Sequence, residues 1–156
     1  WHMIGHLQTN KVKKVVPIAC LIHSVDSLKL IEIINKESKK LNKVTCCLLQ
    51  VNISGEDSKY GLSAENLKSL VNNNLTNEYK NVQFKGLMGM ASFSNDTDLI
   101  KRQFKKLKQL FEDSKEKIND FRILSMGMSN DYKIALEEGS NMIRIGSKIF
   151  GERNYL

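Results

Sequence analysis

The sequence of 156 residues is poor in several residue types, and each shortage excludes a class of protein. It has one proline, so no proline-rich linker divides it into domains. It has no apolar run near the roughly 18 residues of a transmembrane helix, and its first residues do not resemble a signal peptide. Its three cysteines, Cys20, Cys46 and Cys47, are odd in number and do not stand at zinc-ligand spacing. They are expected to be buried, reduced thiols, which predicts a cytoplasmic protein.

Acidic residues are fewer than basic ones, with 17 Asp and Glu against 24 Lys and Arg, which gives a net charge of +7. Such an excess can serve nucleic-acid binding. The basic residues are mostly lysines scattered along helix-like segments such as 29–43 and 100–117, where they alternate with acidic residues beside an apolar stripe. This pattern is typical of solvated helix faces. Because no RNA-reading aromatic motif is present either, the sequence predicts no nucleic-acid partner, and it predicts no membrane partner.

Short apolar runs alternate along the chain with segments of helical period, which is typical of repeated βα units. The run VTCCLLQVNI is apolar on both faces, as expected of a parallel strand buried on both sides. Strands are predicted at residues 3–5, 21–25, 44–53, 82–90, 122–126 and 141–146.

Helices are predicted between these strands, with Asp26 and Ser63 as the first residues of two of them. The strongest helical pattern begins at Asp98, and a short helix over 130–138 is expected to end at Gly139 in the left-handed conformation. The apolar faces are predicted to hold Leu30, Ile31, Ile34 and Leu41 in the first helix, Leu67, Leu70 and Val71 in the second, and Ile100, Phe104, Leu107 and Phe111 in the third.

Six βα units in 156 residues are about 26 residues each. A complete (β/α)8 barrel has about 250 residues, or roughly 31 per unit, so the period fits a barrel that is two units short. An open doubly wound sheet also fits six alternating units. The sequence therefore predicts an α/β fold, and its periodicity leaves both architectures open.

Ligands bind at the carboxyl ends of the strands in both architectures. Polar residues follow the predicted strands at those ends, and for Ser24, Asp26 and Ser92 a purely structural role as helix caps is the alternative. The candidate residues are His6, Ser24, Asp26, Asn52, Ser54, Ser92, Ser129, Asn130, Gly146 and Ser147.

The last two units, LSMGMSND and MIRIGSKIFG, have the composition of a phosphate site. Glycine lets an anion approach backbone N–H groups at the start of a helix, and the hydroxyls of Ser129 and Ser147 can add hydrogen bonds. Arg144 stands in an apolar run, where an unpaired charge would be costly, so a bound anion is one explanation for it. The other is an ion pair with an acidic neighbour such as Glu152.

The blocks WHMIGHLQTNK, HSVDSLKL, LLQVNISGEDSKYGL, GLMGMA, LSMGMSNDYKIALEEGS and MIRIGSKIFGERNY resemble, in order, signature blocks of the pyridoxal phosphate (PLP) homeostasis family, relatives of the N-terminal barrel of alanine racemase. The resemblance implies a (β/α)8 TIM barrel that binds PLP without catalysis and serves vitamin B6 homeostasis. It implies that Ser129, Gly146 and Ser147 hold the phosphate, beside Met128. It implies that Arg144 contacts either the pyridine nitrogen or the phosphate, and it implies no catalytic residue or metal.

The family's Schiff-base lysine belongs to a Val-Ser-Lys-Thr-like block that is absent from this sequence. Residues 1–156 are therefore expected to be a single PLP-binding barrel domain, truncated at the N-terminus, with strands three to eight of the barrel and the lysine upstream of Trp1. The parent is expected to be a monomer, whereas open strand edges would let the fragment self-associate. The alternatives are a PLP-dependent racemase-like enzyme and a barrel that binds another phosphorylated metabolite.

Overall fold

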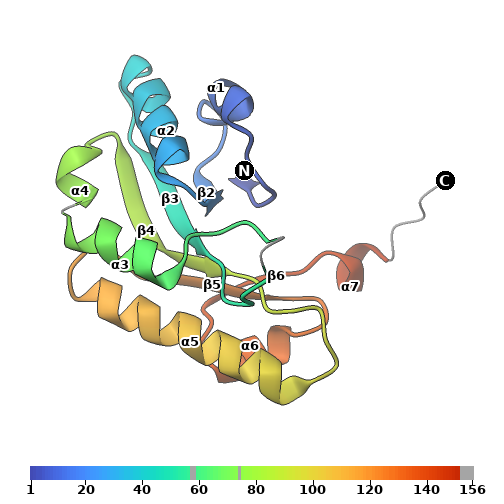
Figure 1. The fold of residues 1–156 in the computed structure, drawn as a ribbon. Coiled ribbons are helices and arrows are strands. Elements are labelled where there is room, and N and C mark those ends of the chain that lie inside the picture. The colour runs from blue at the N-terminus through green and yellow to red at the C-terminus, as the bar shows by residue number, and fades with distance from the viewer. Residues whose placement is uncertain (57–58, 74, 152–156) are drawn as a thin grey trace.

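The computed structural model describes residues 1–56, 59–73 and 75–151, and its framework is one six-stranded sheet (Figure 1). The strands follow one another across the sheet in chain order, and each pairs in parallel with the next. A doubly wound sheet reverses its strand order, so that alternative is wrong, and the sheet is a parallel half-barrel. The strands are β1 (His2–Met3), β2 (Leu21–Val25), β3 (Thr45–Val51), β4 (Val82–Gly89), β5 (Ile123–Met128) and β6 (Met142–Arg144).

The helices connect successive strands, and the main ones lie along the outer face of the sheet (Figure 1). Their buried apolar residues form the principal core together with those of the strands. None of the described helices is long and apolar enough to cross a membrane. They are α1 (Val12–Val15), which follows the 3₁₀ turn η1 (Thr9–Lys11), α2 (Leu28–Lys40), α3 (Ala64–Asn72), α4 (Leu75–Glu78), α5 (Thr97–Lys115), α6 (Tyr132–Glu137) and α7 (Ser147–Phe150).

Helix α5 confirms the strongest helical prediction, because the four apolar residues predicted on its inner face are all buried. It begins one residue earlier than predicted, and Asp96 caps it by accepting the N–H of Leu99 at 3.0 Å. Helix α3 follows Ser63 as predicted, and Ser63 caps it by accepting the N–H of Asn66 at 3.1 Å. The prediction that Gly139 ends α6 in the left-handed region is confirmed as well, since its φ is 90°.

The start of α2 differs from the prediction. Ser27, and not Asp26, caps the helix by accepting the N–H of Leu30 at 3.4 Å. This leaves the carboxylate of Asp26 available for another partner. Leu41 is also wrongly predicted as a core residue, because it follows the last helical turn and is half exposed.

Every second side chain of a strand points to the concave face of the sheet. Leu21, Leu48 and Met88 form a small apolar cluster there, and Ile123 and Met142 pack against it. Two residues further along four of these strands, towards the carboxyl ends, the inward positions are polar: His23, Gln50, Ser125 and Arg144. The concave face therefore has an apolar floor and a polar layer above it.

Gly86 allows β4 to pair closely with β5. Its φ is +155°, and a Cβ atom placed on it would lie 1.7 Å from the carbonyl oxygen of Ile123. The register between β3 and β4 also shifts here, so that Lys85 is an extra residue on β4. Glycine is required because the obstacle is backbone, which cannot rotate away.

Gly86→Ala should lower the free energy of unfolding by at least about 3 kcal/mol, because the added methyl group forces two paired strands apart. Gly5→Ala is the matched control, since a Cβ atom at Gly5 meets nothing within 4 Å. Its effect should stay within about 0.5 kcal/mol. Urea unfolding of the purified full-length variants measures both values, and similar losses for the two would refute the close-approach explanation.

Candidate functional site

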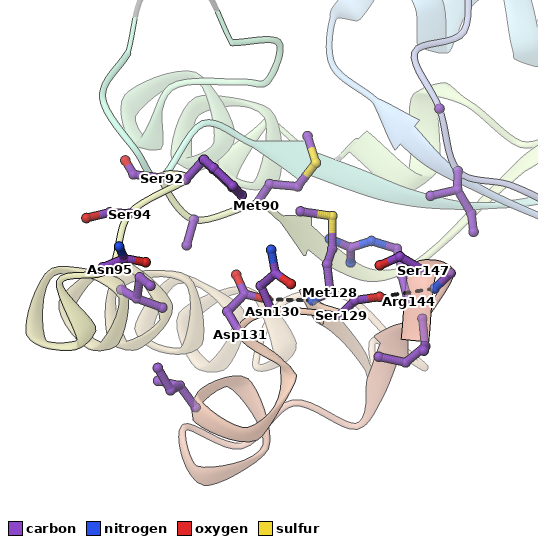
Figure 2. A pocket seen from close by; sticks show the side chains of 18 of the residues that line it. Met90, Ser92, Ser94, Asn95, Met128, Ser129, Asn130, Asp131, Arg144 and Ser147 are labelled. Atoms are coloured by element: carbon purple, nitrogen blue, oxygen red, sulfur yellow. Dashed lines mark hydrogen bonds between the residues drawn. The ribbon is translucent and has the colours of Figure 1, made fainter. Parts of the chain in front are cut away.

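An open pocket of about 1350 Å³ lies at the carboxyl ends of the strands (Figure 2). It is lined by the loops after β1, β4, β5 and β6, together with Gln50 of β3 and Tyr60. The structure brings the residues of the predicted cofactor site to this pocket, which agrees with the rule that parallel α/β folds bind ligands there. Those residues are Met128, Ser129, Arg144, Gly146 and Ser147. In Figure 2, Ser129, Arg144 and Ser147 gather at one end of the pocket, and Ser92, Ser94 and Asn95 lie at the other.

Ser129 joins the loop after β5 to the loop after β6. Its Oγ accepts the backbone N–H groups of Gly146 at 3.4 Å and Lys148 at 3.5 Å. At Gly146 the position of a Cβ atom is open, with nothing within 4 Å, so a ligand can approach the backbone there. Both hydrogen bonds to Ser129 are long and therefore weak. An anion could replace the Ser129 oxygen as the acceptor of these two backbone N–H groups, and the open position at Gly146 leaves room for it.

Arg144 is buried, with 9% of its surface exposed, at the base of the same wall. Its Nη1 donates to Ser125 Oγ at 2.8 Å, and its Nη2 donates to the carbonyl oxygen of Gly89 at 3.1 Å. These two bonds use only part of the five N–H groups of a guanidinium. Burial lowers the pKa of Arg144 to about 10, against the opposing effect of Asp131, so the side chain stays charged at neutral pH.

An ion pair was the alternative explanation for Arg144. Within residues 1–56, 59–73 and 75–151 no carboxylate forms a salt bridge with it. The predicted partner Glu152 lies outside the described residues. Among the described residues, Arg144 is therefore held by a hydroxyl and a carbonyl, neither of which neutralises its charge.

Two further polar residues lie behind Arg144, and sequence reasoning missed both as part of the site. Ser125 is fully buried, and its Oγ is 3.2 Å from Nδ1 of His23, which is 1% exposed. Nε2 of His23 is 3.2 Å from Nδ1 of His2. Burial, together with Arg144 and His2, lowers the pKa of His23 to about 4, so the ring is neutral at pH 7. The available signal was a polar residue at an inward position of an otherwise apolar strand, as in β2 and β5.

The loop after β1 forms another wall, where His6 lies between two partners. Its Nδ1 is 3.1 Å from Oδ2 of Asp26, and its ring stacks on Tyr60 with centroids 3.7 Å apart. The cap role considered for Asp26 is therefore replaced by a hydrogen-bonding contact with His6. Gln50 supports Tyr60 by donating to its carbonyl oxygen at 2.9 Å.

Several other residues predicted at the strand ends are not free to bind a ligand in the pocket. Ser24 is buried within β2 and does not line the pocket, and its hydroxyl has no hydrogen-bond partner among the described residues, so the cap role considered for it is wrong. Asn52 donates to the carbonyl oxygen of Glu56 at 2.9 Å and accepts from Ser54 at 3.0 Å, which shapes the following loop away from the pocket lining. Ser92 lines the pocket, but its hydroxyl is engaged by Glu56 and Gln103.

The three cysteines differ in burial. Cys47 is buried as predicted, whereas Cys46 is only partly buried and Cys20 is exposed, so the expectation of burial is wrong for Cys20. All three are free thiols. In the described part of the chain, no group of three or more His, Cys, Asp or Glu side chains gathers as a metal site.

Comparison with known proteins shows the family to which the chain belongs. The family described as "Alanine racemase, N-terminal domain" matches residues 1–154. The pyridoxal phosphate homeostasis protein of Aquifex aeolicus is 42% identical over 156 residues, which are 99% of this chain and 68% of that protein. The human protein of the same name is 40% identical over 166 residues, and the match covers 99% of this chain and 59% of that protein.

Solved structures agree with this match. PipY of Synechococcus elongatus, solved with PLP bound, has a TM-score of 0.85 at 30% identity, with 97% of this chain and 70% of PipY covered. Alanine racemase of Clostridium difficile has a TM-score of 0.72 at 16% identity over 97% of this chain and 39% of the enzyme, which shows the shared fold alone. The chain belongs to the alanine racemase N-terminal domain family and, within it, to the pyridoxal phosphate homeostasis proteins.

Proposed function

We propose that the protein containing this chain binds pyridoxal 5′-phosphate without catalysing an amino-acid reaction, and that it serves PLP homeostasis. Relatives of 42% and 40% identity carry the name pyridoxal phosphate homeostasis protein, and PipY was solved with PLP bound. The chain spans between 59% and 70% of these three proteins, so the activity of the whole protein is part of the proposal.

The observation that carries the proposal is the buried charge of Arg144. A buried guanidinium with only neutral partners among the described residues is costly, and an anion or a strong acceptor in the pocket offsets that cost. PLP offers both, since it has a phosphate and a pyridine nitrogen that accepts hydrogen bonds. When bound, PLP supplies an electron-accepting ring, and an arginine at the pyridine nitrogen weakens that property. This arrangement suits a carrier better than a transaminase.

The residues of the pocket fit this ligand. The open position at Gly146 and the hydroxyls of Ser129 and Ser147 are assigned to the phosphate. Arg144 is assigned to the pyridine nitrogen, because its guanidinium is held by strands β4 and β5 at the base of the pocket. Met128 is assigned to the cofactor's surroundings, with its side chain partly exposed at the pocket.

We also propose that residues 1–156 are one domain that supplies six of the eight units of a TIM barrel. The sheet ends at β1 and β6, which are the two strands that the remaining units would join in a closed barrel. The parent is proposed to be a monomeric, cytoplasmic protein, in keeping with three free thiols.

Arg144→Ala in the full-length protein should weaken PLP binding about ten- to a hundredfold, because a charge-assisted hydrogen bond contributes about 1.5–3 kcal/mol. Ser129→Ala and Ser147→Ala should cost less, since backbone N–H groups remain. Arg122→Ala is the matched control, because Arg122 is 72% exposed and outside the pocket lining. Titration followed by the near-visible absorbance of PLP measures the affinities and also separates PLP from a sugar phosphate. Unchanged affinity in Arg144→Ala would remove this residue from the site.

Borohydride reduction of the PLP-loaded full-length protein should leave no stoichiometric label on any lysine of residues 1–156. The reason is that no described residue lining the pocket is a lysine. Peptide mass mapping after proteolysis locates the label. One stoichiometrically labelled lysine within this chain would overturn the assignment of the family's lysine to a segment outside it.

A racemase-like or decarboxylase-like activity is the second candidate. The observation in its favour is the His6–Asp26 pair stacked on Tyr60 at the pocket wall, since histidine and tyrosine are common acid–base groups. Against it, Nδ1 of His6 is engaged by Asp26 and one face of its ring is engaged by Tyr60. The carboxylate of Asp131 similarly accepts the N–H of Met128 at 2.6 Å.

The full-length protein loaded with PLP should therefore show no appreciable racemisation, transamination or decarboxylation of common amino acids. Assays with each amino acid, run beside an authentic alanine racemase, measure this directly. Turnover on the order of 1 per second, as in typical enzymes, would refute the non-catalytic proposal. Loss of such turnover in His6→Ala would then assign it to the His6 wall.

A further inference from the structure

A row of four polar side chains, three of them buried, crosses the concave face behind the pocket. It starts at His2 of β1 and continues through His23 of β2 and Ser125 of β5 to Arg144 of β6. The successive contacts measure 3.2, 3.2 and 2.8 Å. Strands β2 and β5 are not neighbours in the sheet, so this row joins the two ends of the half-barrel through its interior.

The direction of the hydrogen bonds in this row follows from Arg144. A guanidinium can only donate, so Ser125 Oγ accepts from it. The single hydroxyl hydrogen of Ser125 is then available to Nδ1 of His23, which must be unprotonated to accept it. A neutral His23 carries its hydrogen on Nε2 and donates it to Nδ1 of His2. Donation therefore runs from Arg144 to Ser125, to His23 and to His2.

We propose that His23, acting through Ser125, is a positioning residue that holds Arg144 in the orientation needed for the ligand. This inference rests on the proposed binding of PLP. Arg144 is anchored at the carbonyl oxygen of Gly89, which belongs to the backbone, and at the hydroxyl of Ser125, which can rotate. His23 fixes that rotation by accepting the hydrogen, so the lone pairs of Ser125 face Arg144. The remaining N–H groups of the guanidinium stay directed by these two anchors.

Protonation of His23 would reverse the direction of the hydrogen bond between Ser125 and His23. Its Nδ1 would become a donor, so Ser125 Oγ would face two donors and its own hydrogen would lose its acceptor. Two cations would then share one hydroxyl. Burial and the proximity of Arg144 and His2 lower the pKa of His23 to about 4, which keeps it neutral above about pH 5.

Other titratable groups near His23 do not change its protonation state. Strand β3, paired with β2, carries the thiols Cys46 and Cys47 as its titratable groups, and burial raises the pKa of Cys47 so that it stays neutral. Strand β5 carries no charged residue. The groups that lower the pKa of His23 are Arg144 and His2, and Asp131 acts on the pKa of Arg144 in turn.

The test compares His23→Gln with His23→Leu in the full-length protein, with PLP as the probe. The glutamine amide can accept from Ser125 and donate to His2, so His23→Gln should bind PLP within about twofold of wild type. Leucine can do neither, and His23→Leu should weaken binding about tenfold, as expected for one lost hydrogen bond. Ser125→Ala removes the anchor itself and should weaken binding at least as much, which keeps the test valid if His23→Leu does not fold.

Inorganic phosphate is the control ligand, because it occupies the Ser129–Ser147 end and does not need the pyridine contact of Arg144. Its competition constant should be the same in wild type, His23→Gln and His23→Leu. The pH profile gives a second readout. Between pH 5.5 and 4, wild type should lose PLP affinity more steeply than His23→Gln, in which the glutamine does not titrate. The ionisation of PLP itself is common to both proteins and cancels in the comparison.

The outcomes separate the two proposals. A wild-type protein that does not bind PLP overturns the proposed function. PLP binding that is equal in wild type, His23→Leu and Ser125→Ala overturns the role of His23 and leaves the proposed function standing. An equal loss of PLP and phosphate binding in His23→Leu, or a loss in His23→Gln as large as in His23→Leu, also contradicts the positioning role. The expected pattern is loss of PLP binding only, restored by glutamine.

Discussion

The buried guanidinium of Arg144 is the constraint on which the pocket depends. It lies on the last described strand and reaches back to the carbonyl oxygen of Gly89 on β4 and the hydroxyl of Ser125 on β5. A buried charge of this kind is costly unless its N–H groups find hydrogen-bond acceptors. This requirement explains why Ser125, at the inward position of the neighbouring strand β5, is polar, although the floor beneath it is apolar.

The sheet makes that arrangement possible because its strands pair closely and in chain order. Gly86 removes the side chain that would hold β4 and β5 apart, and Gly127 does the same between β5 and α6, where a Cβ atom would lie 2.6 Å from that of Ala135. Each close approach lets the strand ends converge on one rim. The geometry of the sheet therefore places the pocket, and the polar side chains at the strand ends determine what it can bind.

The sequence predicted the elements of this fold well because their signals are local. The bounds of β2 match the prediction, and the buried face of α5 was predicted from spacing alone. The choice between Asp26 and Ser27 as a cap could not be made locally, since it depends on His6, which is twenty residues away. The row from His2 to Arg144 joins residues of four strands, two of them more than a hundred residues apart, so no spacing rule identifies it. Motif resemblance pointed to the residues at the pocket surface and not to those behind them.

The two walls of the pocket differ in what they leave to a ligand. On one wall, His6 contacts Asp26 by a hydrogen bond and Tyr60 by a stacked ring. On the other, Arg144 keeps its charge and part of its hydrogen-bonding capacity, and Ser129 holds only long contacts of 3.4 and 3.5 Å. A ligand gains most where the protein's own groups are least satisfied, because there it adds bonds without breaking strong ones. The hydrogen-bonding capacity that the protein leaves unused is therefore concentrated at Arg144 and Ser129, where it favours an anionic ligand.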